Sequence, residues 1–141
     1  MVLADKLSLD KEATRAQFLE HTCNTLDNWK FVANALGAEL IFVMQPVSFC
    51  APHELTTEEE SWFENKSNMA KLRRAAEPFE GWFAEALSAE CQRLGIPFED
   101  SNKTFGLNIN EPLFIDPLHL TDQGNREIVK IVDNVLASVE K

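Results

Sequence analysis

Apolar positions in the first third of the chain follow a helical pattern and then a strand pattern. Between residues 11 and 36 they recur at helical spacing and end before Gly37, a good C-terminal cap, which predicts one long helix or two in line. Its weakest point is at residues 22–25, where poor helix formers cluster. Residues 40–44 then form an unbroken apolar run, typical of a central parallel strand covered on both faces. A helix followed by such a strand is half of a βαβ unit.

After this strand the pattern predicts a loop and a short helix. A Gln-Pro pair ends the strand, and residues 47–56 form a loop at its C-terminal end. This is the edge where open α/β sheets place ligands, so the loop is a candidate wall of a site. The spacing Thr57-x-x-Glu60 predicts a capping box that opens a short helix through residue 63.

The pattern of the second half predicts two more helices and a second strand. A helical pattern runs from Met69 to Leu94 before Gly95, and Pro78 inside it predicts a bend near Glu77. Residues 96–100 contain a proline and predict a short edge strand, followed by a surface loop at 101–111.

The chain ends in a predicted helix at residues 122–139. Its apolar face carries Ile128, Ile131 or Val132, Val135 and Val139. We expect the tryptophans and phenylalanines that lie at helical spacing along the chain to belong to the core. The whole pattern predicts one α/β domain over residues 1–141, helix-rich and with about two parallel strands.

A carboxylate and an imidazole stand three residues apart just before this last helix. Asp116 and His119 are joined by a turn that Pro117 stiffens, so both side chains can point the same way. An aspartate that accepts from one imidazole nitrogen leaves the other free to take a proton, as in a serine-hydrolase triad. The alternative is an ordinary turn into a helix that Thr121 caps, with Asp122 in its first turn.

The residues around this pair favour the catalytic interpretation over an ordinary turn into a helix. The run Asp116-Pro-Leu-His-Leu-Thr121, with Gly124-Asn125 and the apolar helix positions beyond, closely resembles the last sequence block of the SGNH (GDSL-type) hydrolases. Residues 40–46 resemble the late core strand of that family, which ends in Gln-Pro. The resemblance covers most of the chain, but only the C-terminal half of the family's domain.

The resemblance implies the C-terminal half of a three-layer, flavodoxin-like α/β/α domain that hydrolyses esters or removes acyl groups. Its substrates would be small-molecule, carbohydrate or lipid esters, and it would use neither a metal nor an organic cofactor. Asp116 would orient the imidazole, and His119 would be the general base and then the acid. The serine block Gly-Asp-Ser and the oxyanion donors of the family are absent from this sequence, so an upstream segment would have to supply them. The alternative is a noncatalytic α/β module that self-associates or binds a protein.

Ser48 and Cys50 are the candidates for a nucleophile inside this chain. They follow the predicted strand at the correct edge of a sheet, and a cysteine would be the more reactive once paired with an imidazole. Small polar residues are also typical of loops, and no sequence feature around Ser48 indicates a strained turn. His21 is expected on a helix surface, and His53 in the candidate site loop, where it could contact substrate. No metal-binding motif joins the histidines.

Composition and charge indicate which partners and which cellular compartment to expect. The net charge of −10 argues against nucleic acid, and 45% hydrophobic residues are normal for a globular domain. Three widely spaced cysteines predict free thiols in a reducing compartment. Because residues 1–10 have no long apolar run and no basic start, we expect no signal peptide or membrane span, and a cytoplasmic location. A homo-oligomer or a separate N-terminal half remains open as the partner.

Overall fold

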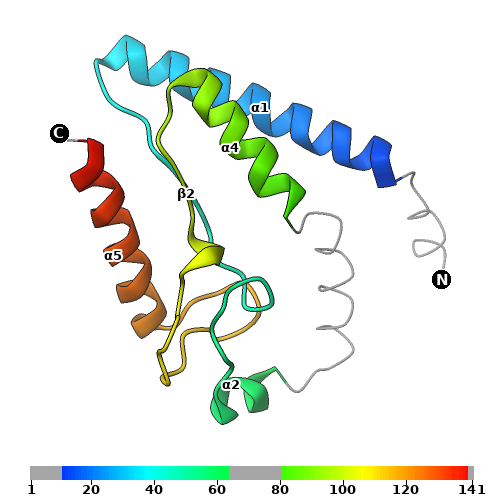
Figure 1. The fold of residues 1–141 in the computed structure, drawn as a ribbon, viewed down its shortest axis with the longest axis vertical. Coiled ribbons are helices and arrows are strands. Elements are labelled where there is room, and N and C mark those ends of the chain that lie inside the picture. Colours follow the sequence, from blue (N-terminus) through cyan, green and yellow to red (C-terminus); the bar gives the residue numbers. More distant parts are fainter. Residues whose placement is uncertain (1–10, 64–80, 140–141) are drawn as a thin grey trace.

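The computed structural model describes residues 11–63 and 81–139 (Figure 1). Within these residues the chain is helix-rich and carries a two-stranded parallel sheet, which confirms the predicted α/β class. The elements in chain order are α1 (Lys11–Leu36), β1 (Phe42–Met44), α2 (Thr57–Trp62), α4 (Trp82–Leu94), β2 (Phe98–Asp100), the 3₁₀ turn η3 (Ser101–Lys103) and α5 (Asp122–Val139).

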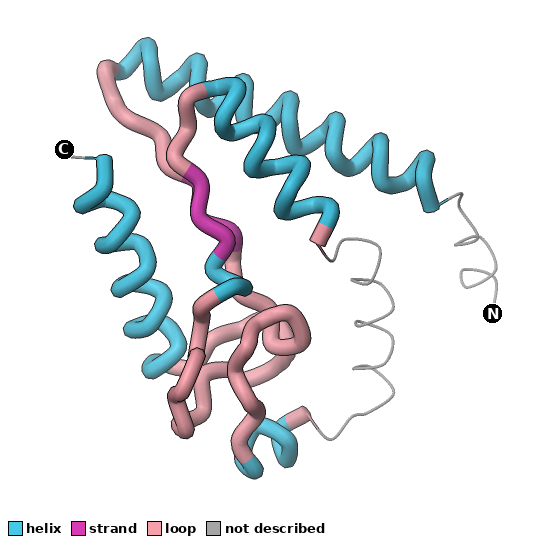
Figure 2. Tube along the Cα trace, in the orientation of Figure 1, coloured by secondary structure: helices cyan, strands magenta, loops and turns pink. Residues whose placement is uncertain are grey.

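The helices lie on two sides of the strand pair. α1 packs against α4, and α4 also contacts β2. α5 lies on the other side of the strands in Figure 1. The loops gather beyond one end of the strands, near α2 and the start of α5 (Figure 2). The core is accordingly divided into a cluster between helices and strands and a cluster under the loops. The first contains Leu26, Leu87, Cys91 and Ile96, and the second contains Phe63, Phe105, Leu113 and Phe114.

The sequence predicts one long helix or two in line for this region, and α1 is a single helix. It runs from Lys11 to Leu36 without a break at the threonine-rich point. There the hydroxyls of Thr22 and Thr25 each donate to the carbonyl four residues earlier, at 2.9 Å. This local bond lets a threonine stay inside a helix. Gly37 follows the helix with φ +64°, the left-handed conformation expected of a C-terminal cap.

The two strands are shorter than predicted. β1 pairs in parallel with β2, with Phe42 opposite Phe98 and Met44 opposite Asp100. The prediction that residues 40–44 form a central strand covered on both faces is wrong. All three residues of β1 are half-buried, because β1 pairs with β2 alone and no described strand lies on its other edge. The second strand is confirmed for Phe98–Asp100.

Some of the tryptophans and phenylalanines expected in the core are exposed, and for them the prediction is wrong. Trp29 on α1 is 59% exposed, and Phe18 on α1 and Trp62 on α2 are exposed as well. Phe31 and Leu36 on α1 are also exposed. α1 packs on its neighbours through the face that carries Leu26, which is buried. Helical spacing therefore identified apolar positions, but only a packed neighbour buries them.

The capping box of α2 lies one residue earlier than predicted. The N–H of Glu59 donates to Thr56 Oγ1 at 3.3 Å, and the N–H of Thr56 donates to Glu59 Oε2 at 2.7 Å. The predicted pair, Thr57 and Glu60, has the same spacing. Glu59 is fully buried whereas Glu60 is exposed, so tertiary packing selects the register.

The helix predicted from Met69 to Leu94 is described from Trp82 onward. Its first part, with the bend predicted near Glu77, lies outside the described residues. α4 ends at Leu94, and Gly95 follows with φ +64° as its left-handed cap, as predicted.

α5 (Asp122–Val139) begins where the sequence predicts. The N–H of Gly124 donates to Thr121 Oγ1 at 3.0 Å, which makes Thr121 the N-terminal cap. Ile128 and Ile131 pack against the cluster under the loops, while Val129 on the opposite face is exposed. Neither α5 nor any other helix in the described residues has the length and hydropathy needed to cross a membrane.

Candidate active-site loop

Residues 114–120 form a closed loop at the start of α5. Phe114 and Leu120 form an isolated antiparallel bridge at its base, and the N–H of Ile115 donates to the carbonyl of His119 at 2.9 Å. The N–H of Thr121 donates to the carbonyl of Leu113 at 2.9 Å. Because both ends of the loop are bonded together, its side chains are held at defined positions.

Asp116 and His119 meet within this loop, as the sequence predicts. His119 Nδ1 lies 2.7 Å from Asp116 Oδ2. The other carboxylate oxygen, Oδ1, accepts from the N–H of Leu118 and the N–H of His119, both at 2.9 Å. The turn between the two residues therefore orients the carboxylate through its own backbone.

The electrostatics of the pair favour an ionised aspartate. Partial burial raises the pKa of Asp116, but the hydrogen bonds from the Leu118 N–H, the His119 ring and the His119 N–H lower it more. The pKa therefore lies below the ordinary aspartate value, and the carboxylate is charged at neutral pH. An ionised Asp116 can only accept, so Nδ1 of His119 carries the proton. His119 Nε2 is then left as the acceptor, on a side chain that is 75% exposed.

The loop after β1 is hydrogen-bonded to the loop of residues 114–120. The side chain of Gln45 donates from Nε2 to the carbonyl of Leu118 at 2.5 Å, and the N–H of Ser48 donates to the carbonyl of Pro117 at 3.0 Å. Asp116 and His119 consequently lie near the carboxyl end of a parallel strand. This is the edge of a sheet where α/β proteins place their ligands.

Sequence reasoning missed two residues that support this arrangement, Gln45 and Asn102. The side chain of Asn102 accepts from the N–H of Val47 at 2.8 Å and donates to the carbonyl of Gln45 at 3.2 Å. These bonds tie the loop after β1 to the 3₁₀ turn after β2. No local signal could have shown them, because the partners are more than 50 residues apart.

The two nucleophile candidates occupy different environments. Ser48 is buried, and within the described residues its hydroxyl has no hydrogen-bond partner, so it is not bonded to His119. Cys50 lies in the turn after Ser48 and is exposed. Its N–H donates to the carbonyl of Val47 at 2.9 Å. The serine is close to the loop through its backbone only.

The other two histidines lie away from the Asp116–His119 pair. His21 is exposed on α1, as predicted. His53 is fully buried and bonds Glu59 at 2.9 Å, so the prediction that it could contact substrate from an open loop is wrong. Within residues 11–63 and 81–139, no group of three His, Cys, Asp or Glu side chains is placed to hold a metal ion.

Burial raises the pKa of two of the thiols, Cys23 and Cys91. Cys23 and Cys91 are free, as predicted. Burial raises the pKa of Cys91 to about 11, so it is a core residue and not a nucleophile.

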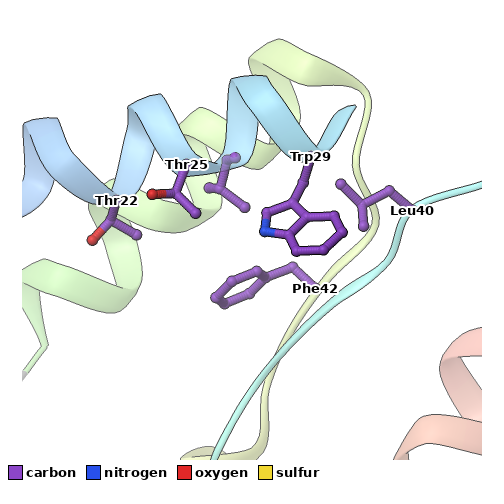
Figure 3. Close-up of a pocket in the computed structure, with 6 residues that line it drawn as sticks. Thr22, Thr25, Trp29, Leu40 and Phe42 are labelled. Atoms are coloured by element: carbon purple, nitrogen blue, oxygen red, sulfur yellow. The ribbon is translucent and has the colours of Figure 1, made fainter. Parts of the chain in front are cut away.

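A separate apolar pocket opens between α1 and the segment that leads into β1. It has a volume of about 260 Å³, and Figure 3 shows Leu40 and Phe42 opposite Trp29. Its lining is completed by Thr22, Thr25 and Leu26. Neither Asp116 nor His119 is among the lining residues.

Comparison with known proteins adds no relative. No protein-family model matches this chain, and no curated protein matches it. The resemblance to SGNH hydrolases therefore stays a prediction from the sequence, based on the Asp-x-x-His block and the Gln-Pro strand end.

Proposed function

We propose that this chain is the C-terminal part of an SGNH-type serine hydrolase that cleaves esters or acyl groups. The observation that carries the proposal is the 2.7 Å contact between His119 Nδ1 and Asp116 Oδ2, with the rest of the imidazole exposed. This is the pairing of orienter and base that a serine nucleophile needs. The nucleophile and the oxyanion donors come from a polypeptide segment outside these 141 residues.

The chemistry assigns one role to each member of the pair. His119 Nε2 takes the proton of the serine hydroxyl as that oxygen attacks the acyl carbon. Asp116 stabilises the imidazolium that forms, and Nε2 then gives the proton to the leaving alcohol. Ile115 and Leu118 are exposed beside the pair, which suits an acyl chain or another apolar part of an ester. No step calls for a metal or an organic cofactor.

An esterase assay with p-nitrophenyl acetate tests this function. Removing one oxyanion donor costs about 10²- to 10³-fold in rate, so the isolated chain should show no turnover above background. Turnover should appear when a polypeptide with the Gly-Asp-Ser half, encoded in frame upstream, is added. His119→Ala should abolish that turnover, whereas His21→Ala, at an exposed histidine on α1, should not change it.

Two results would contradict the proposal in different ways. Turnover by the chain alone that is lost in both His119→Ala and Ser48→Ala would make Ser48 the nucleophile, and no second segment would be needed. No turnover in any mixture would remove the hydrolase function.

A noncatalytic binding module is the second candidate, and a different observation favours it. β1 has an open edge among the described strands, α1 exposes Phe31 and Leu36, and the exposed Trp29 lines the apolar pocket. Open strand edges and exposed apolar surface are typical of protein interaction sites. In this function Asp116 and His119 would only shape the turn into α5.

A further inference from the structure

Glu59 on α2 is a fully buried carboxylate surrounded by donors from three segments. Its Oε1 accepts from the N–H groups of Leu113 and Phe114, both at 2.8 Å. Its Oε2 accepts from the N–H of Thr56 at 2.7 Å and from His53 Nε2 at 2.9 Å. Burying a charge this completely is costly unless it is hydrogen-bonded, and the Glu59 carboxylate accepts from four donors.

The environment keeps this carboxylate charged. Burial raises the pKa of Glu59, but the hydrogen bonds from Thr56, His53, Phe114 and Leu113 lower it more, and the pKa lies below the ordinary glutamate value. Since the carboxylate can only accept, His53 donates from Nε2. Within the described residues His53 Nδ1 is buried without a hydrogen-bond partner.

The two N–H groups that Glu59 holds belong to residues 113–114, the segment that leads into the candidate active-site loop of residues 114–120. Phe114 forms the bridge at the base of that loop, and Asp116 follows two residues later. The carbonyl of Leu113 in turn accepts from Thr121, at the other end of the loop. One side chain on α2 therefore fixes the backbone from which both Asp116 and His119 project.

We infer that Glu59 is a positioning residue. It holds the backbone of residues 113–114, which leads into the candidate active-site loop, so that His119 meets Asp116. The inference deepens the proposed function of the same site. It assigns Glu59 no contact with substrate. Its neighbour Glu60 is exposed on the same helix and carries the same charge, so it offers a matched control.

The test is nitrogen NMR of the full ¹⁵N-labelled chain, with the His119 ring signals assigned by their loss in His119→Asn. When the ring is neutral, wild-type His119 should carry its proton on Nδ1, facing Asp116. Glu59→Ala should shift the ring toward the mixture of tautomers of a free imidazole. Glu60→Ala should leave the wild-type pattern unchanged.

An unchanged His119 pattern in a folded Glu59→Ala chain overturns the inference. If that variant does not fold, Glu59→Asp decides, because it keeps the charge but is one methylene too short to reach all of its partners at once. Loss of Nδ1 protonation in Glu59→Asp supports the positioning role, and retention overturns it. The readout needs no turnover, so this result is separate from the esterase assay.

Discussion

At the scale of the residue, Gly124 sets how closely α5 approaches the candidate active-site loop of residues 114–120. It is buried in the first turn of the helix, and a Cβ at this position would overlap the backbone carbonyl of Leu113 and lie 3.1 Å from the Cβ of Leu120. Leu113 is the residue whose N–H bonds Glu59 and whose carbonyl accepts from Thr121. Because Gly124 has no side chain, the first turn of α5 can lie directly against the backbone of Leu113.

Gly124→Ala should destabilise the protein. In an unconstrained helix this change stabilises by about 1 kcal/mol, whereas extra atoms in a packed site cost about 1–3 kcal/mol. We expect the packing cost to dominate, since the nearest atom is backbone and cannot rotate away. Urea unfolding followed by circular dichroism measures the difference, with Asn125→Ala, at the exposed neighbouring position, as the control. A more stable Gly124→Ala chain would show that α5 can move without cost.

At the scale of the element, α2 is joined to the active-site loop through one buried charge. α2 is only six residues long, too short to be stable as an isolated helix, and its capping box shares the Glu59 carboxylate with Leu113 and Phe114. The helix and the loop should therefore lose their structure together when that charge is lost.

Acid should weaken the fold through this connection. The pKa of Glu59 is lower in the folded chain than the ordinary glutamate value of about 4.3. A lowered pKa contributes stability that is present above about pH 4.3 and is lost as pH falls through the folded-state value. We expect the free energy of unfolding, measured by urea titration between pH 7 and pH 3, to fall below about pH 4.3.

Glu59→Gln should make this acid dependence shallower and lower the stability at pH 7. An amide offers one acceptor oxygen to donors that a carboxylate satisfies with two. Glu60→Gln, at an exposed site, should keep the wild-type profile. Equal slopes for wild type and Glu59→Gln would mean that other carboxylates, such as Asp116 with its lowered pKa, cause the acid sensitivity.

At the scale of the whole molecule, apolar surface and net charge act in opposite directions. The exposed apolar side chains of α1 and the edge of β1 that no described strand pairs favour association, while a net charge of −10 makes copies of the chain repel one another. Salt weakens the repulsion, since the screening length falls to about 10 Å at 0.1 M.

Association should therefore increase with salt and depend on the face of α1. In sedimentation velocity, the wild-type chain should exceed its monomer mass of 16.0 kDa at high concentration, and more so at 0.5 M salt than at low salt. Phe31→Glu with Leu36→Glu should remain monomeric. The matched control, Asn28→Glu with Asn34→Glu, changes exposed polar positions of the same helix and should associate more than the apolar-face variant. A wild-type chain that is monomeric in all conditions would exclude this face as a contact between copies.

The sequence by itself determined the features that depend on near neighbours. The end of α1 follows from helical spacing and Gly37, and the start of α5 from helical spacing and the Thr121 cap. The contact between Asp116 and His119 is equally local, because only two residues, Pro117 and Leu118, separate them. The mixed α/β class follows from the same local periodicities.

Tertiary structure alone decided burial, register and long-range support. Trp29 and Phe31 are as apolar as Leu26, yet only Leu26 has neighbours that cover it. The capping box lies one residue earlier than the sequence predicts, and two of the donors to Glu59, the N–H groups of Leu113 and Phe114, come from more than 50 residues away. Burial and long-range hydrogen bonds depend on which distant segments pack together. The spacing of residues along the chain carries no information about such tertiary contacts.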